Sequence, residues 1–170
     1  SEGLLGLGHT VGVVALLDGA TRPVGGILQF SGQLLRHGFH GASPGRLDQH
    51  LAPFYEVELE NGTLTREAAK ELLSLFWIKF NNQPAPPKVG VTLKESATYT
   101  DFCNINSGGL KADGSDGVNA VSYLVLEVID EMRLLQPSSN IQLSRKNPDL
   151  FLKKAAAVVA KGWGQPSIFN

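Results

Sequence analysis

The stretch from Tyr99 to Asn119, YTDFCNINSGGLKADGSDGVN, most constrains how this chain can fold. After Asn106 it has neither helical nor strand periodicity, yet hydrophobic segments flank it on both sides. Its four glycines supply backbone conformations that other residues avoid, and its Asn, Asp and Ser side chains bond the backbone locally. A long polar loop between packed elements is usually functional or disordered. We therefore expect an ordered loop with a functional role.

The segments around this loop alternate between strand and helix patterns. Strands are expected at Val89–Thr92, at Tyr99–Ile105, around Ile141 and Leu143, and at Ser167–Phe169. Such short apolar or alternating runs, separated by helical segments, are typical of strands. Strand, helix, strand, helix, strand is the order of an α/β fold with a parallel sheet. The sequence therefore predicts the α/β fold class.

Three helices are predicted from apolar residues spaced three and four apart. The first runs from an N-cap at Thr65 to about Phe80, and the second begins at Asn119 or Ser122 and ends before Pro137.

The third helix is expected to be capped by Asn147, to have Pro148 at its first position and to stop at Gly162. Its predicted core-facing residues are Phe151, Leu152, Ala155, Val158 and Val159.

Composition excludes several classes of protein. The 170 residues, 42% of them hydrophobic, are enough for one domain with a substantial core. The net charge of −1 with scattered Lys and Arg gives no basic surface for nucleic acid. The apolar runs are too short for a membrane span. The single cysteine excludes an internal disulfide framework and fits a reducing compartment, so we expect a cytoplasmic location.

Four sequence runs occur in a distinctive order: N-I-N-x-G-G from Asn104, D-G-x-D-G-x-N from Asp113, L-x-Q-P from Leu134 and G-x-G-x-P-x-x-x-N from Gly162. A G-R-x-D-Q run precedes them at Gly45. In this order they resemble the glycyl radical enzymes, the pyruvate formate-lyase-like lyases, decarboxylases and dehydratases. The resemblance covers residues 45–170 well and residues 1–41 poorly. It implies that residues 1–170 are one fragment, internal to a longer chain, of that family's α/β barrel domain.

The resemblance also implies the activity. A glycyl radical lyase cleaves a C–N, C–C, C–O or C–S bond of a small organic substrate after a cysteine thiyl radical abstracts hydrogen, in anaerobic metabolism. The pattern places the catalytic cysteine, its glutamate and the radical glycine beyond Asn170. We therefore assign no catalytic residue, no bound cofactor and no metal ligand to this chain; the parent enzyme is implied to carry the glycyl radical. The nearest branch is expected to be choline trimethylamine-lyase and the arylacetate decarboxylases.

Partners follow from the same resemblance. They are a small-molecule substrate, a radical SAM activating enzyme and a second copy of the full-length chain in a homodimer. The charge pattern and the short apolar runs, rather than the resemblance, predict no nucleic-acid and no membrane partner.

Two residues are candidates for substrate binding by the resemblance. Phe102 falls where several family members place a bulky aromatic in the substrate pocket, and a ring there suits an apolar group or a cation. Ser43 lies just ahead of the G-R run, where some members have a substrate-contacting serine. Each has a structural alternative: Phe102 as a core aromatic in a strand, and Ser43 as plain turn chemistry with Pro44 and Gly45.

Other polar residues favour structural roles. His37 and His40 have a helical metal-ligand spacing, but Gly38 weakens a helix there. Asp113, Asp116 and Asn119 lack the spacing of an EF-hand, so we expect them to shape the loop.

Cys103 has no adjacent glutamate and is expected to pack as a small core residue rather than act as a nucleophile. Asn104 and Asn106 alternate about Ile105, so we expect them on one polar face with structural hydrogen bonds.

A non-catalytic α/β module with a structural or binding role is the competing interpretation. The sequence that flanks these residues in the parent chain would distinguish the radical enzyme from the non-catalytic module. A G-C-x-E run downstream and an R-V-x-G-Y run near the C-terminus of the parent chain would mark the radical enzyme.

Overall fold

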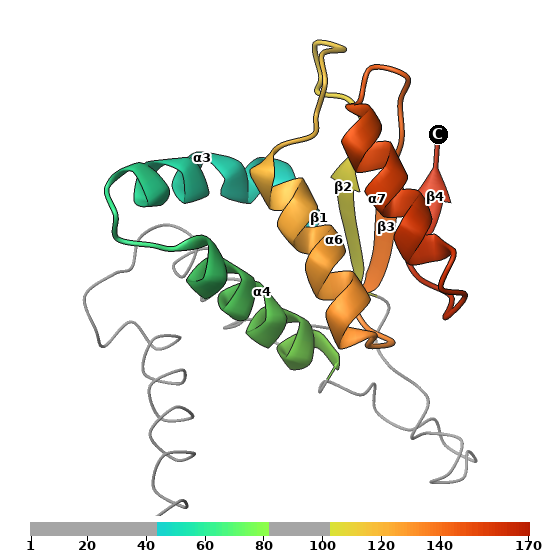
Figure 1. Ribbon diagram of the computed structural model, residues 1–170, viewed down its shortest axis with the longest axis horizontal. Coiled ribbons are helices and arrows are strands. Elements are labelled where there is room, and N and C mark those ends of the chain that lie inside the picture. The colour runs from blue at the N-terminus through green and yellow to red at the C-terminus, as the bar shows by residue number, and fades with distance from the viewer. Residues whose placement is uncertain (1–43, 82–102) are drawn as a thin grey trace, which may run out of the picture.

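The computed structural model describes residues 44–81 and 103–170 of the chain. Within these residues it contains four strands and four helices (Figure 1). The strands are β1 (Gly45–Arg46), β2 (Asn104–Gly108), β3 (Ser138–Gln142) and β4 (Ser167–Phe169). The helices are α3 (Leu47–Glu60), α4 (Arg66–Asn81), α6 (Ala120–Met132) and α7 (Asp149–Val159). None of the described helices is long and apolar enough to cross a bilayer.

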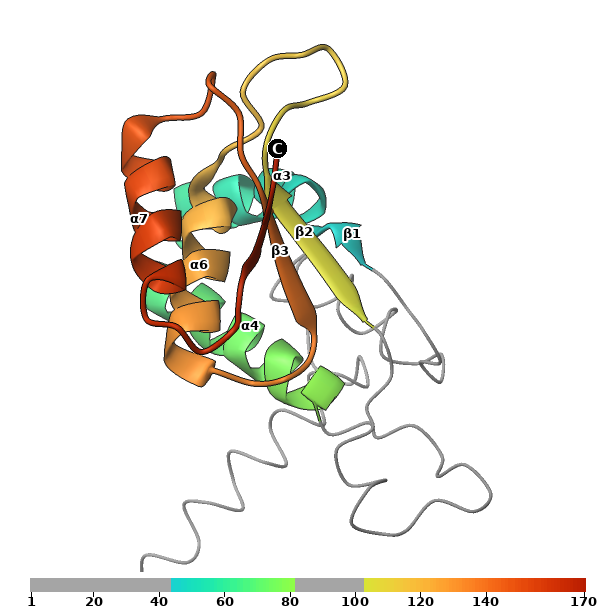
Figure 2. The same cartoon turned by 90° about the vertical axis from the view of Figure 1, so that its right-hand side faces the viewer.

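The four strands form one parallel sheet in the order β1-β2-β3-β4. α6 connects β2 to β3 and α7 connects β3 to β4, and both helices lie on the same side of the strands (Figure 2). A doubly wound sheet reverses its strand order and covers both faces with helices. Sequential parallel strands with helices on one face are instead the winding of an α/β barrel wall. The predicted α/β fold is confirmed in this form.

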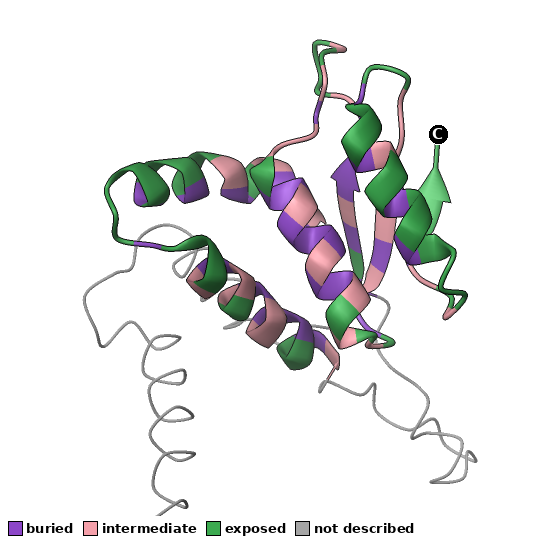
Figure 3. Cartoon of the chain, viewed as in Figure 1, coloured by how far each residue is buried: buried purple, intermediate pink, exposed green. Residues whose placement is uncertain are grey.

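The core lies between the sheet and the helices. Ile105 of β2 and Ile141 of β3 are at most 1% exposed and belong to the same buried cluster as the apolar residues of α6. The buried side chains of α6 repeat at helical spacing (Figure 3): Val121, Leu124, Val125, Val128 and Ile129. Burying each of these contributes about 1.5–3 kcal/mol, which makes α6 the central helix of this layer.

The opposite face of the sheet is polar. Asn104, Asn106, Asn140 and Gln142 alternate with the buried residues of β2 and β3, and each is partly or fully exposed. The register pairs Asn106 with Asn140, so the amide side chains form a row across the strands. We call this surface the uncovered face, because no described helix lies on it (Figure 2). The expectation that Asn104 and Asn106 share a polar face is confirmed, and Asn140 Nδ2 lies 3.4 Å from Asn104 Oδ1.

α6 begins as its sequence predicts. The Asn119 side chain accepts hydrogen bonds from the amides of Val121 and Ser122 at 2.9 and 3.2 Å, and Ser122 Oγ accepts from the Asn119 amide at 3.1 Å. This reciprocal capping satisfies backbone donors that a helix N-terminus otherwise leaves unpaired. The Thr65 cap of α4 is also confirmed, by a 3.2 Å bond from the Ala68 amide.

Four predictions for β3 and α7 are corrected. Asn147 does not cap the helix, because its Oδ1 accepts from the Ser144 amide at 2.7 Å while its Nδ2 donates to the long loop. Pro148, expected at the first helical position, occupies the N-cap position and makes no side-chain bond there. Val159 is 40% exposed rather than core-facing, since it lies on the outer side of the last turn. Leu143 follows β3 instead of belonging to it.

The strand expected at Tyr99–Ile105 also has different bounds. Tyr99–Phe102 lie outside the described residues, and β2 continues to Gly108 because its pairing with β3 extends through Gly108 and Gln142. The strand predicted at Val89–Thr92 lies outside the described residues as well. Ser167–Phe169 is confirmed as β4.

We predict that Gly108 tolerates no side chain. A Cβ there would lie 2.6 Å from the Gln142 carbonyl oxygen and 2.8 Å from the Phe151 ring, in a backbone with φ of +79°. Gly162 is the matched control, since its φ is +75° but nothing lies within 4 Å of its Cβ position. Gly162→Ala should lower the free energy of unfolding by about 1–2 kcal/mol, the left-handed backbone cost alone. Gly108→Ala should lower it by at least about 3 kcal/mol, because overpacking is added. Equal losses in denaturant unfolding would contradict this.

Candidate functional site

The two predicted substrate-binding residues, Ser43 and Phe102, lie outside the described residues. The first residues described after them, Pro44 and Cys103, are both buried and lead directly into β1 and β2. These strands are neighbours in the sheet and pair in parallel. The structure therefore brings the segments that follow the two candidates next to each other.

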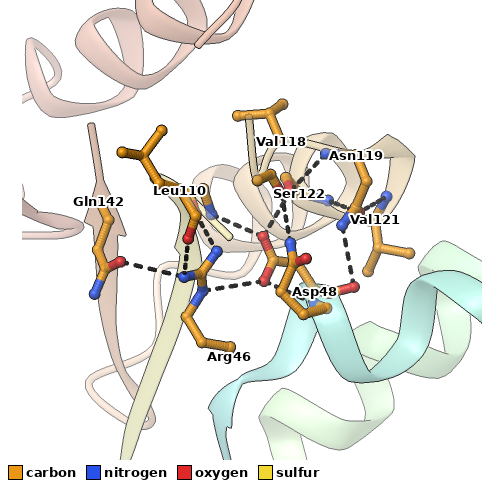
Figure 4. Close-up of polar contacts among 12 residues, drawn as sticks. Arg46, Asp48, Leu110, Val118, Asn119, Val121, Ser122 and Gln142 are labelled. Atoms are coloured by element: carbon orange, nitrogen blue, oxygen red, sulfur yellow. Dashed lines mark hydrogen bonds and ion pairs between the residues drawn. The ribbon is translucent and has the colours of Figure 1, made fainter. Parts of the chain in front are cut away.

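A buried carboxylate organises the opposite end of these strands. Asp48, in the first turn of α3, is 0% exposed. Its Oδ2 accepts hydrogen bonds from the Gly108 amide and from Ser122 Oγ, both at 2.7 Å, and its Oδ1 accepts from the Gln49 amide at 2.8 Å (Figure 4). Asn119 Nδ2 also donates to the Asp48 carbonyl at 3.3 Å. One side chain thus joins α3, the end of β2 and the start of α6.

Arg46 completes this arrangement from β1. Its Nη1 donates to the Leu110 carbonyl at 2.8 Å and lies 3.5 Å from Gln142 Oε1, while its Nη2 donates to the Gly108 carbonyl. Its Nε lies 3.8 Å from Asp48 Oδ1 (Figure 4). Carbonyl oxygens are suited to the planar fork of a guanidinium, which presents five donors in fixed directions. Arg46 therefore ties β1 to the ends of β2 and β3.

The burial of Asp48 changes the pKa of its side chain. Burial raises the pKa of its carboxyl group above the ordinary value, while the Gly108 amide, the Ser122 hydroxyl and the Arg46 charge oppose that rise. A carboxyl group whose pKa is higher in the folded state binds its proton more tightly there than in the unfolded chain. Its stabilising contribution is complete at pH values below the unfolded pKa and is lost as the pH rises through the folded pKa.

The long loop predicted from the sequence is ordered. Gly117 donates to the Gly109 carbonyl at 2.8 Å and Lys111 to the Ser115 carbonyl at 2.9 Å, so the loop folds back on itself. Asp113 accepts from the amide and hydroxyl of Ser115, which lower the pKa of its carboxyl group.

Asp116 accepts from the Val118 amide at 3.0 Å. The prediction that Asp113, Asp116 and Asn119 shape the loop is confirmed by these bonds and by the Asn119 cap of α6.

A second loop holds the first in place. Asn147, between β3 and α7, donates to the Gly109 carbonyl and to Asp116 Oδ1, both at 2.7 Å. Lys146 Nζ donates to the Gly114 carbonyl at 2.6 Å. Both loops follow the carboxyl ends of parallel strands, the edge at which α/β folds commonly build their sites.

The role of the G-R-x-D-Q run was not found from the sequence. The run itself was visible, but Asp48 meets Gly108 and Ser122 across 60 and 74 residues of chain. A buried position three residues after the turn glycine Gly45 gives no local signal for partners so distant. The cue available was an acidic residue in the first turn of a helix, which indicates only a favourable dipole contact.

Cys103 is 3% exposed and belongs to the hydrophobic core, as its predicted packing role requires. His37 and His40 lie outside the described residues. In the ranges 44–81 and 103–170, no three His, Cys, Asp or Glu side chains are grouped to hold a metal ion.

A groove on the helix side offers little for a ligand. It has a volume of about 180 Å³ and runs between α6 and α7. Its charged lining residues pair with one another, Glu127 with Lys154 at 3.4 Å and Asp130 with Lys161 at 2.6 Å. Charged groups already paired at the surface do not select a ligand. The groove therefore gives no support to the interpretation of the chain as a binding module.

The hydrogen-bonded cluster around Asp48 holds structural elements in place and does not itself take part in a reaction. Asp48 is enclosed and its oxygens are occupied by protein donors, so it does not reach a substrate. Among the described strand residues, the amides of the uncovered face at Asn104, Asn106, Asn140 and Gln142 are partly or fully exposed and can contact a ligand.

A family model described as "Pyruvate formate lyase-like" matches residues 28–170. Over 128 residues the chain is 66% identical to a trans-4-hydroxy-L-proline dehydratase from Clostridioides difficile, covering 75% of this chain and 16% of the relative. It is 38% identical over 130 residues to the 4-hydroxyphenylacetate decarboxylase glycyl radical subunit of Clostridioides difficile strain 630, covering 76% of this chain and 14% of that protein. The chain thus spans 16% or less of the length of both relatives.

Solved structures give the same result. A crystal structure of hydroxyproline dehydratase from Clostridioides difficile with trans-4-hydroxy-L-proline bound matches with a TM-score of 0.69 at 66% identity, over 75% of this chain and 16% of that one. A glycyl radical enzyme from Archaeoglobus fulgidus matches with a TM-score of 0.68 at 30% identity, over 84% and 18% of the two chains.

Two buried serines test the bonds around Asp48. Ser122 bridges Asp48 and the Asn119 amide, whereas Ser107 Oγ has no hydrogen-bond partner among the described residues; both side chains are 0% exposed. Ser122→Ala should lower the free energy of unfolding by about 1–3 kcal/mol, because two polar groups lose a partner. Ser107→Ala should stay within about 0.5 kcal/mol of wild type or raise stability, because an unbonded buried hydroxyl is removed. Denaturant unfolding measures both, and a larger loss for Ser107→Ala would refute the assignment.

Proposed function

The chain belongs to the pyruvate formate lyase-like family, and from that premise we propose that it forms part of the barrel of a glycyl radical dehydratase acting on trans-4-hydroxy-L-proline. The 66% identity to a trans-4-hydroxy-L-proline dehydratase carries this proposal, because the decarboxylase subunits reach only 38% over a similar length. The motifs alone had placed the chain nearest to choline trimethylamine-lyase and the arylacetate decarboxylases. The difference in identity favours dehydration, a C–O cleavage.

The proposed reaction balances without an external oxidant or reductant. Trans-4-hydroxy-L-proline loses its hydroxyl group and one ring hydrogen as water, which leaves a pyrroline carboxylate. A glycine radical and a cysteine thiyl, supplied by parts of the enzyme outside this chain, would provide the hydrogen abstraction. A radical SAM activating enzyme and a homodimer of the full-length chain are proposed partners on the same family grounds.

The residues of this chain would bind and orient the substrate. At neutral pH the amino acid carries an ammonium and a carboxylate, and neutral amide side chains can accept from the first and donate to the second. The uncovered face presents such amides at Asn104, Asn106, Asn140 and Gln142. A face that lines a closed barrel would also exclude water from the reacting carbon.

Substrate competition tests the proposal. The full-length enzyme that contains this chain, activated without oxygen, should convert trans-4-hydroxy-L-proline to a pyrroline carboxylate and water. With 4-hydroxyphenylacetate as the matched alternative, kcat/KM should be lower by at least about a thousandfold, because a site that pairs with an ammonium leaves buried groups unsatisfied when the ligand lacks one. Mass spectrometry of the products decides. Decarboxylation of 4-hydroxyphenylacetate as the preferred reaction would refute the dehydratase proposal.

Phe102 is proposed as an apolar wall against the pyrrolidine ring and its ammonium. Phe102→Ala should then reduce kcat/KM by about a hundredfold or more through poor orientation, while the melting temperature falls only as a large-to-small substitution requires. Phe102→Leu should retain more stability than activity, because volume is partly kept and the ring face is not. Cys103→Ser is the adjacent control and should keep turnover. Unchanged kinetics in a destabilised Phe102→Ala enzyme would remove Phe102 from the site.

A further inference from the structure

β1 is too short to be placed by its own backbone. It contributes two residues to the sheet, with Gly45 opposite Ile105 and Arg46 opposite Asn106. Strands usually extend over about 5–6 residues, so two residues provide only a weak main-chain tether. Side-chain contacts must therefore fix where β1 lies against β2.

Arg46 supplies those contacts on the uncovered face. It stands in register with Asn106 and Asn140, and its guanidinium extends along that face to Gln142, one row nearer the carboxyl edge. Its acceptors are the Gly108 and Leu110 carbonyls and the Gln142 amide oxygen, which come from β2, the loop after it and β3. One side chain of β1 thus links to β2 and β3, and so relates the positions of the three strands along the strand direction.

Gln49 secures the far end of the same loop. Its Nε2 donates to the Gly117 carbonyl, while Gly117 itself donates to the Gly109 carbonyl at 2.8 Å. Arg46 at the start of the loop and Gln49 at its end both come from the β1–α3 junction. The loop and the uncovered face are therefore held from one short segment.

We propose that Arg46 is a positioning residue for the reaction. By fixing the positions of β1, β2 and β3 along the strand direction, it aligns the amide row of the uncovered face for the substrate. This inference rests on the proposed function, in which that face meets the substrate. Arg46 acts through its neighbours, because its side chain is only 26% exposed and its Nη donors are directed to protein oxygens. Lysine cannot replace it, since an ammonium lacks the planar fork that reaches separate acceptors together.

Arg46→Lys in the full-length activated enzyme is the main test. Its kcat/KM for trans-4-hydroxy-L-proline should fall by at least about tenfold, mostly in kcat, because small misplacements of reacting groups lose much of the rate. The glycyl radical signal per protein, measured by electron paramagnetic resonance, should stay unchanged. Arg66→Lys is the matched control: Arg66 bonds both carboxylate oxygens of Glu127 at 2.7 Å on the helix side and should keep its kinetics.

Amide hydrogen exchange provides a readout that needs no activity. Exchange at the amides of Lys111, Gly114 and Gly117, which bond within the loop, should accelerate by at least about tenfold in Arg46→Lys and not in Arg66→Lys. Gln49→Met removes the donor at the other end of the loop without a change in charge. It should accelerate hydrogen exchange at the same amides, and it supplies the exchange test if Arg46→Lys does not fold.

The outcomes separate the two proposals. Unchanged exchange, a kcat/KM within about twofold of wild type, or a loss that parallels the radical yield each overturns the positioning role. A wild-type enzyme that does not dehydrate trans-4-hydroxy-L-proline refutes the proposed function instead, and the exchange measurement then decides alone whether Arg46 fixes the loop.

Discussion

The Asp48 carboxylate is the interaction on which the rest of the structure depends. It is fully buried, and burial of an ionisable group is costly unless donors surround it. The donors come from Gln49, Gly108 and Ser122, so the group is satisfied only when α3, the end of β2 and the start of α6 meet at one point. Loss of any partner leaves a buried acceptor short of a bond. The requirement is therefore cooperative, and it makes the junction of the three elements specific.

The two faces of the sheet follow from this junction. Ile105 and Ile141 belong to the buried cluster that includes α6, so the apolar residues of β2 and β3 occupy one side of the sheet. Because strand side chains alternate, the polar residues must occupy the other side. Sequential parallel strands with helices on one side have the winding of a barrel wall, and we propose that the polar face is its inner surface. Such a surface would suit the charged substrate proposed above better than an apolar surface would.

Most helix starts and strands follow from local signals, whereas long-range polar contacts leave no local signal. The start of α6 at Asn119, the Thr65 cap and β4 follow from spacing, capping residues and turn residues within a few positions. Asn147 has the same local signal as Asn119, yet its Oδ1 accepts from the Ser144 amide and its Nδ2 donates to Gly109 across 38 residues, so it does not cap α7. The contacts of Arg46 and Asp48 with the end of β2, the loop after it and α6 have no local signal, because those partners lie at least 60 residues away. Sequence pattern gives the elements, whereas the partners available in the folded chain decide how a polar side chain is used.

The position of the chain's one cysteine also bears on the proposed radical reaction. A thiyl radical can exchange a hydrogen atom with another thiol that lies nearby. The described strands place Arg46 and the amides of Asn106, Asn140 and Gln142 on the uncovered face. Cys103 precedes Asn104 and, by alternation along β2, lies on the side of Ile105, where it is 3% exposed. The fold thus keeps this chain's one thiol within the core, behind the wall that we propose faces the radical.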